Sequence, residues 1–86
     1  MTDETLRNTI VRILHRVHPS PLRLDTLAAE CEVALSEGLT RADFRRELDA
    51  LKAARLIGTG RTGIGDCAEM AFLTHAGQAE AARAFG

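Results

Sequence analysis

The sequence predicts one mainly helical α+β domain with a small β-hairpin. Apolar residues recur at helical spacing in the N-terminal part, a Gly-rich segment then leads into an alternating one, and an Ala-rich segment follows. The 86 residues, 1–86, are enough for a single domain. The chain is 45% hydrophobic but has no Trp or Tyr, so we expect a core built mainly of aliphatic residues.

The first two expected helices cover about residues 3–17 and 24–35. The stripe of the first is Leu6, Ile10, Ile13, Leu14 and Val17. Pro19 and Pro21 end this helix and leave room for a short extended piece before the next. The stripe of the second is Leu24, Leu27, Ala28, Cys31, Ala34 and Leu35. Gly38 is its expected terminator.

The third expected helix, about residues 41–56, has the clearest start in the chain. Thr40 can cap it while the carboxylate of Asp43 reaches back, as in a capping box. Leu39 and Phe44 have the spacing of a hydrophobic staple. Phe44 also begins the face that we expect to be buried.

A hairpin is expected over about residues 57–73, with a turn at residues 62–66. In its second strand Met70 and Phe72 share one face, while Ala71 and Leu73 share the other. Thr74 can cap a final helix over about residues 75–85, whose first turn Gly77 weakens.

This order of elements, with three local patterns, resembles the winged helix-turn-helix family of bacterial transcription regulators. The patterns lie at residues 24–28, 44–57 and 72–77, where the last reads Phe-Leu-Thr-His-Ala-Gly. The resemblance implies a three-helix core, a wing and a C-terminal helix. It also implies a DNA-binding domain that is a transcription regulator or part of one, whose third helix enters the major groove of double-stranded DNA.

The charges are unevenly distributed, although the formal net charge is only −1. Residues 24–38 contain four acidic and no basic residues. On a helical wheel of about 100° per residue, Arg41, Arg45 and Lys52 of the third helix form one basic stripe. With Arg61 and Thr62 near the wing tip, they are the candidate DNA-binding residues, because Arg and Lys bind phosphates and guanine edges.

Two alternatives stay open. The basic stripe can be ordinary solvated surface, or the domain can be a protein–protein interaction module that does not bind DNA. The acidic second helix or the Ala-rich last helix would then be the contact surface. The last helix can form a homodimer across a twofold axis, or it can pack back on the first helix.

No catalytic, metal or cofactor site is expected. Residues 58–63 fit the pattern Gly-x-Gly-x-x-Gly, but they precede a strand, whereas dinucleotide binding needs a helix there. His15 and His18 are three residues apart on a helix, a spacing that can bind a metal, but neither Cys31 nor Cys67 has a close partner in the sequence to complete a zinc site. No Ser–His–acid or Cys–His arrangement is recognisable, so we expect no enzyme. No apolar run approaches the length of a membrane span, which suggests a cytoplasmic protein.

Overall fold

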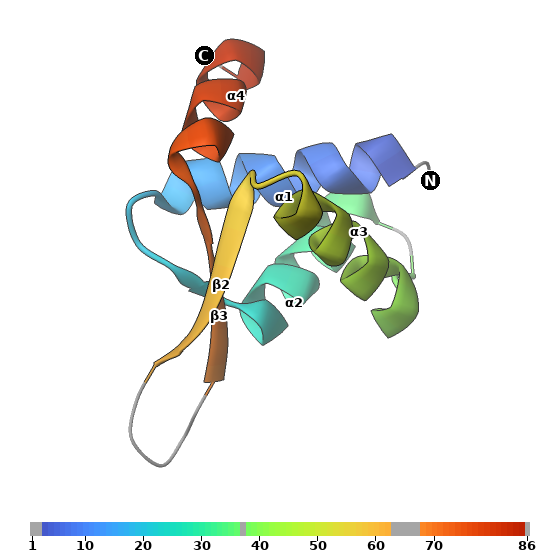
Figure 1. Cartoon of the computed structure of the whole chain (residues 1–86). Coiled ribbons are helices and arrows are strands. Elements are labelled where there is room, and N and C mark those ends of the chain that lie inside the picture. The colour runs from blue at the N-terminus through green and yellow to red at the C-terminus, as the bar shows by residue number, and fades with distance from the viewer. Residues whose placement is uncertain (1–2, 37, 63–67, 86) are drawn as a thin grey trace.

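A computed structural model of the chain describes residues 3–36, 38–62 and 68–85. These residues form four helices and a small antiparallel sheet, which confirms the α+β class (Figure 1). In chain order the elements are α1 (Asp3–Val17), β1 (Leu22–Arg23), α2 (Leu24–Leu35), α3 (Arg41–Ala53), β2 (Ile57–Thr62), β3 (Ala68–Leu73) and α4 (His75–Phe85). No helix in these ranges is both long and apolar enough to span a membrane.

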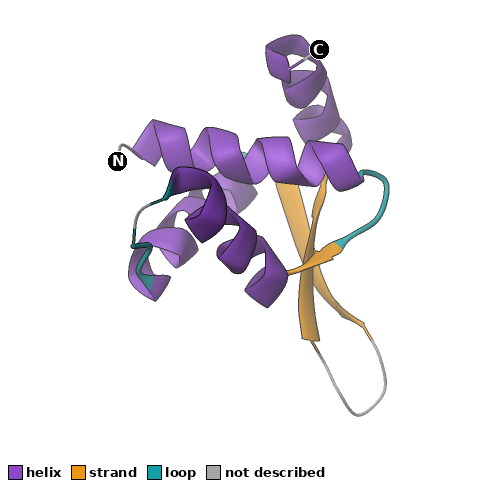
Figure 2. Ribbon diagram, turned by 180° about the vertical axis from the view of Figure 1, so that it is seen from behind, coloured by secondary structure: helices purple, strands orange, loops and turns teal. Residues whose placement is uncertain are grey.

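Helix α1 lies across the molecule, with α2 and α3 on one side of it and α4 on the other (Figures 1 and 2). The hairpin of β2 and β3 extends away from the helices, past the N-terminal end of α2. The strand order is β1-β3-β2, so β3 is the central strand. The short β1 joins the sheet through Leu22, which pairs with Ala71.

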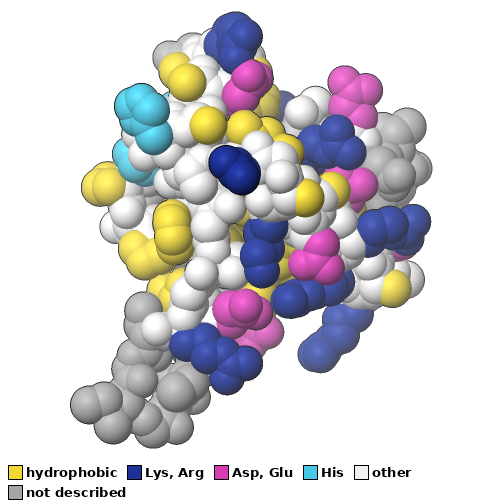
Figure 3. All heavy atoms as spheres, viewed as in Figure 1, with side chains coloured by type: hydrophobic (Ala, Val, Ile, Leu, Met, Phe, Trp, Pro, Cys, Tyr) yellow, Lys and Arg dark blue, Asp and Glu magenta, His cyan; other side chains and the backbone are white. Residues whose placement is uncertain are grey.

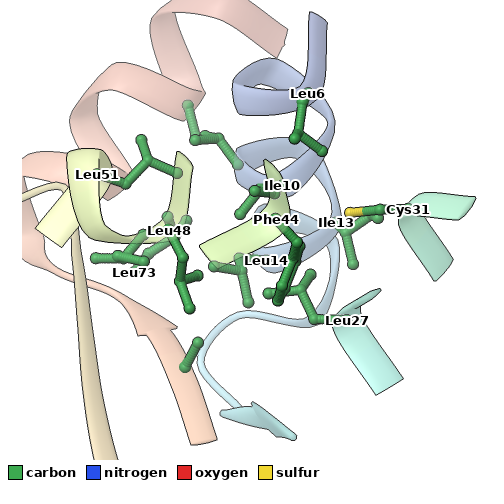
Figure 4. Packing of buried hydrophobic residues seen from close by; sticks show 14 residues of the cluster. Leu6, Ile10, Ile13, Leu14, Leu27, Cys31, Phe44, Leu48, Leu51 and Leu73 are labelled. Atoms are coloured by element: carbon green, nitrogen blue, oxygen red, sulfur yellow. The ribbon is translucent and has the colours of Figure 1, made fainter. Parts of the chain in front are cut away.

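The core is a single aliphatic cluster to which every helix contributes (Figure 4). Its largest fully buried side chains are Leu6, Ile10, Leu14, Leu27, Leu48, Leu51 and Cys31. Burying an aliphatic side chain of this size stabilises a fold by about 1.5–3 kcal/mol. Ala34, which we expected on the buried stripe of α2, is exposed, because α2 buries only the face around Leu27 and Cys31.

The start of α3 has the expected cap but not the full capping box. The backbone N–H of Asp43 donates to Oγ1 of Thr40 at 3.1 Å, which confirms the cap. The carboxylate of Asp43 does not reach back to the start of the helix; it accepts a hydrogen bond from Arg46 instead. Phe44 is buried and Leu39 packs against the same cluster, as a hydrophobic staple requires.

Helix α2 ends at Leu35, as the sequence predicts, but the residue that stops it is Ser36 and not Gly38. Ser36 takes up the left-handed conformation (φ 54°) that we assigned to a glycine. Helix α3 ends at Ala53 and not at residue 56. Arg55 has φ 63° and donates to the carbonyl of Lys52, and Leu56 donates to that of Leu51. This is a Schellman motif without glycine, which the sequence gives no signal to predict.

In the sheet, the face of Ala71 and Leu73 lies against the helices. These two residues are buried while Phe72 is 41% exposed, so the predicted alternation of β3 is confirmed. Phe72 pairs with Gly58 of β2, and its ring covers that glycine. Further along the hairpin Arg61 pairs with Glu69, on the same face as Ala71.

Thr74 joins α4 to the end of α3. Its hydroxyl accepts from the N–H of Gly77 (3.1 Å), which confirms the predicted cap, and donates to the carbonyl of Arg55 (2.6 Å). Its N–H donates to the carbonyl of Leu56 at 3.1 Å. Helix α4 packs back on α1, where the guanidinium of Arg12 lies 5.2 Å from the centroid of the Phe85 ring. A homodimer through α4 stays a prediction.

Gly77 has a packing role that the sequence does not reveal. A Cβ atom at this position would lie 1.9 Å from the carbonyl oxygen of Leu56. We therefore expect Gly77→Ala to destabilise the protein by about 2 kcal/mol or more, because the backbone of α4 would have to move away. The free energy of unfolding from urea denaturation measures this effect. Gly38→Ala is the matched control, because no atom lies within 4 Å of its Cβ position. Equal effects of the two substitutions would contradict the packing role.

A buried carboxylate fixes α3 to α1. Glu47 is only 4% exposed, and its Oε2 accepts from Nε of Arg7 at 3.1 Å. The sequence gives no sign of this pair, because Arg7 and Glu47 lie 40 positions apart in the chain.

Arg7→Met should destabilise the fold by about 1–3 kcal/mol, since it leaves the Glu47 carboxylate buried without its partner. The same change at Arg46, whose pair with Asp43 is exposed, should alter stability by about 0.5 kcal/mol at most. Urea denaturation of both variants makes the comparison. If Arg7→Met is as mild as Arg46→Met, the buried pair does not stabilise the contact between α1 and α3.

Candidate functional site

The exposed basic stripe of α3 is set by the face that the helix buries. Phe44, Leu48 and Leu51 point into the core, which leaves Arg41 and Arg45 exposed and Lys52 half-buried. Figure 3 shows Lys and Arg side chains spread over the α3 side of the molecule, with acidic side chains between them. The stripe is therefore present on the surface, but it is not a uniform positive patch.

Arg45 already has two carboxylate partners. Its Nε lies 3.5 Å from Oδ1 of Asp49, one turn further along α3. Its Nη1 donates to Oε1 of Glu69 on β3 at 3.4 Å. The sequence suggests no neighbour for Glu69, because the contact depends on how the hairpin lies against α3.

Glu69 brings the helix and the hairpin together. Arg61 of β2 is its direct cross-strand partner, on the same face of the sheet. Directly opposed residues of antiparallel strands have Cβ atoms about 4.5–5.5 Å apart. Glu69 is therefore both the ion-pair partner of Arg45 and the cross-strand neighbour of Arg61. Of the predicted site residues, the structure thus brings these two together.

The remaining predicted site residues differ in what surrounds them. Arg41 and Lys52 form no ion pair with any residue that the structure describes, so their charges are available to a partner. Thr62 ends β2, where its backbone pairs with Ala68, but its side chain lies outside the described part of the chain.

A groove of about 1150 Å³ separates α2 from α3. On the α2 side Asp25 and Glu32 line it, and on the α3 side Arg41 and Arg45 do. The apolar lining between them includes Leu24, Ala28, Leu39, Ala42 and Phe44. Glu69 also lines the groove, from β3. We call this feature the α2–α3 groove.

The described part of the glycine-rich segment, residues 58–62, is a strand and not a phosphate-binding turn. Gly58 and Gly60 lie in β2, and the next described element is the strand β3 rather than a helix. The third glycine of the pattern, residue 63, lies outside the described residues. Dinucleotide binding through this pattern needs a helix N-terminus directly after the glycines.

The cysteine and histidine residues that the structure describes do not gather into a ligand set. In residues 3–36, 38–62 and 68–85 no three His, Cys, Asp or Glu side chains are placed to hold a metal ion. Cys31 is fully buried in the core, whereas Cys67 lies outside the described part. Burial, helped by the nearby Glu30 carboxylate, raises the pKa of the Cys31 thiol from 9.0 to about 12. A thiol in this state is a poor nucleophile and a poor metal ligand.

No family model, curated protein or solved structure matches this chain. A functional proposal has to rest on the fold and on the arrangement of these charged side chains.

The state of Cys31 gives a direct prediction. In a Cys67→Ser variant, we expect Cys31 to react with a thiol reagent at pH 8 at least about 100 times more slowly in the folded than in the urea-unfolded protein, because it is buried and protonated. The pKa is raised on folding, so the protonated thiol contributes stability that is complete below pH 9.0 and is lost towards pH 12. Rapid reaction of the folded variant would show that this part of the core opens readily.

Proposed function

We propose that the chain is a winged helix-turn-helix domain that binds double-stranded DNA, as a transcription regulator or as part of one. The observation that carries the proposal is that α3 and the hairpin each bring an arginine to Glu69: Arg45 pairs with its carboxylate, and Arg61 is its cross-strand neighbour. Arg41 and Lys52 extend the same stripe along α3. Helix α3 would enter the major groove, and the hairpin β2–β3 would be the wing.

The order of elements supports this proposal. A short strand before α2 joins the hairpin in one sheet, and α3 runs directly into the first hairpin strand. The wing and α3 are therefore on the same side of the molecule (Figure 2). The major groove is about 12 Å wide and admits one α-helix. A helix with an adjacent hairpin can contact bases and neighbouring phosphates at once.

The charge distribution limits how strong such binding can be. The formal net charge of −1 gives no long-range attraction to a polyanion, so binding depends on the few cations of the stripe. Arg45 would have to exchange the carboxylates of Asp49 and Glu69 for a phosphate or a guanine edge. We expect moderate, salt-sensitive affinity for one copy of the domain.

A second candidate function is protein–protein interaction without DNA binding. The observation that favours it is the exposed face of α2, where Asp25, Glu30 and Glu32 have no basic residue beside them in the helix. Such a face repels a phosphate backbone and suits a basic protein surface.

Equilibrium binding to a random-sequence duplex, followed by fluorescence anisotropy over a salt series, separates the two candidates. The proposal predicts binding whose logarithmic affinity falls linearly with the logarithm of the salt concentration. Arg45→Gln and Lys52→Gln should each raise Kd about tenfold, the effect of one good charged contact. Arg46→Gln is the matched control on the same helix, because Arg46 lies off the stripe and pairs with Asp43.

Glu69→Gln should change Kd in the opposite direction from Arg45→Gln and Lys52→Gln. This change removes one of the two carboxylate partners of Arg45 and takes a negative charge away from the DNA phosphates, so Kd should fall by about two- to tenfold. Loss of affinity in Glu69→Gln would show that this contact does not restrain Arg45. Absence of binding at low salt, or an equal effect of Arg46→Gln and Arg45→Gln, would reject DNA binding by the stripe and favour the protein-interaction function.

A further inference from the structure

The α2–α3 groove has one acidic and one basic side. We call Asp25 and Glu32 of α2 its acidic wall, and Arg41 and Arg45 of α3 its basic wall. All four side chains are exposed, and the walls belong to different helices. The groove thus separates the charges into two rows.

The apolar lining between the walls allows a partner to come close. Ala28 and Ala42 are small, and the partly buried Leu39 and Leu24 belong to the edge of the core. A partner that contacts this lining would remove apolar surface from water, which favours association. It would also strengthen the charge pairs around the lining, since they would be less screened by solvent.

A polyanion or a polycation would match only one of the two walls. Arg23 and Glu69, which also line the groove, add one charge of each sign. The partner must therefore carry a basic row and an acidic row of its own, in the complementary order.

A second copy of the chain meets this requirement by symmetry. A twofold axis that runs along the groove places α2 of one copy opposite α3 of the other, and the reverse. Each acidic wall then faces a basic wall, and all four rows of charge are paired in one isologous contact. From this geometry we infer that the α2–α3 groove is a homodimer interface, held by two equivalent sets of pairs between Asp25 or Glu32 and Arg41 or Arg45.

Two other exposed surfaces of the described residues, around Val33 and on α4, do not show this self-complementarity. Val33 is 79% exposed near Arg16 and Glu30, but it is a single apolar side chain of a kind common on protein surfaces. The exposed alanines of α4 carry no charge pattern that would select a partner.

The dimer does not depend on DNA binding, but it would affect it. Arg41 and Arg45 belong both to the basic wall and to the proposed DNA-binding stripe, so the groove-paired dimer covers two of the cations that DNA would contact. Dimerisation and DNA binding then exclude one another, and each weakens the other by the same factor.

The test is sedimentation equilibrium of the full chain without DNA, over a range of protein and salt concentrations. We expect a reversible monomer–dimer equilibrium that weakens with salt. Asp25→Arg with Glu32→Arg makes both walls basic, and Arg41→Glu with Arg45→Glu makes both walls acidic. Each double variant alone should dimerise at least about tenfold more weakly, because like charges then face one another.

Mixing the two double variants is the decisive step. Two basic walls then meet two acidic walls, so a heterodimer should form with a Kd within about threefold of the wild-type value. Arg46→Glu with Arg83→Glu changes the net charge as much as the acidic variant does but leaves the groove intact. This control should dimerise like wild type and should form no such heterodimer with the basic variant. Circular dichroism verifies that each variant is folded. If a double variant does not fold, Glu32→Arg and Arg41→Glu replace the pairs.

The interface is supported if a heterodimer forms between the basic-wall and the acidic-wall variants but not between the basic-wall variant and the control. Glu30→Arg, on α2 but outside the groove, should leave the dimer unchanged. A wild-type protein that stays monomeric throughout overturns the inference. So does a dimer that survives both wall reversals, or one that is abolished by Arg83→Glu, which would place the contact on α4. None of these readouts involves DNA, so their failure is separate from that of the proposed function.

Discussion

The packing of α3 against α1 determines which charges this protein presents to a partner. Leu48 and Leu51 are almost fully buried, and Glu47 beside them holds Arg7 of α1. These contacts fix the rotation of α3 about its own axis. Arg41 and Arg45 consequently point outwards together, towards the groove and the hairpin. A rotation of the helix by one residue, about 100°, would turn these side chains away from their present face. Both proposals therefore depend on this packing.

Glu69 connects the hairpin to α3 electrostatically. It lies opposite Arg61 in the sheet and within hydrogen-bonding distance of Arg45. At partly exposed positions such a pair adds little to stability. In the proposed function it would act on binding, because an anion that approaches Arg45 competes with a carboxylate that is already there. The same residue thus lies between the arginines of α3 and β2 and would lower their attraction for a polyanion.

The sequence predicts the elements well where a local signal exists. The cap at Thr40, the cap at Thr74 and the alternation of β3 each depend on residues close in the chain, and the structure contains all three. The predicted end of α3 is three residues too late, because the left-handed residue that stops the helix is Arg55 and not a glycine.

The candidate site is less predictable, because its geometry depends on contacts between distant segments. The face of α3 that carries Arg41, Arg45 and Lys52 follows from periodicity alone. The contact of Arg45 with Glu69 spans 24 residues and that of Arg7 with Glu47 spans 40, and neither has a local signal. The role of Gly77 is equally hidden in the sequence. Glycine is unfavourable within a helix, and only the nearby carbonyl of Leu56 explains why this position lacks a side chain. Ion pairs between distant residues and close backbone contacts can be identified only from the packed structure.

We propose that α3 and the hairpin together form one DNA-binding surface. An NMR titration of the isotope-labelled protein with a short duplex tests it most directly, because every backbone amide reports separately. The account predicts that the largest shifts occur in α3 around Arg41, Arg45 and Lys52 and in β2 around Arg61, while the amides of α4 change little. Shifts confined to α4 or to the outer face of α2, or a spectrum unchanged by excess duplex, would contradict it.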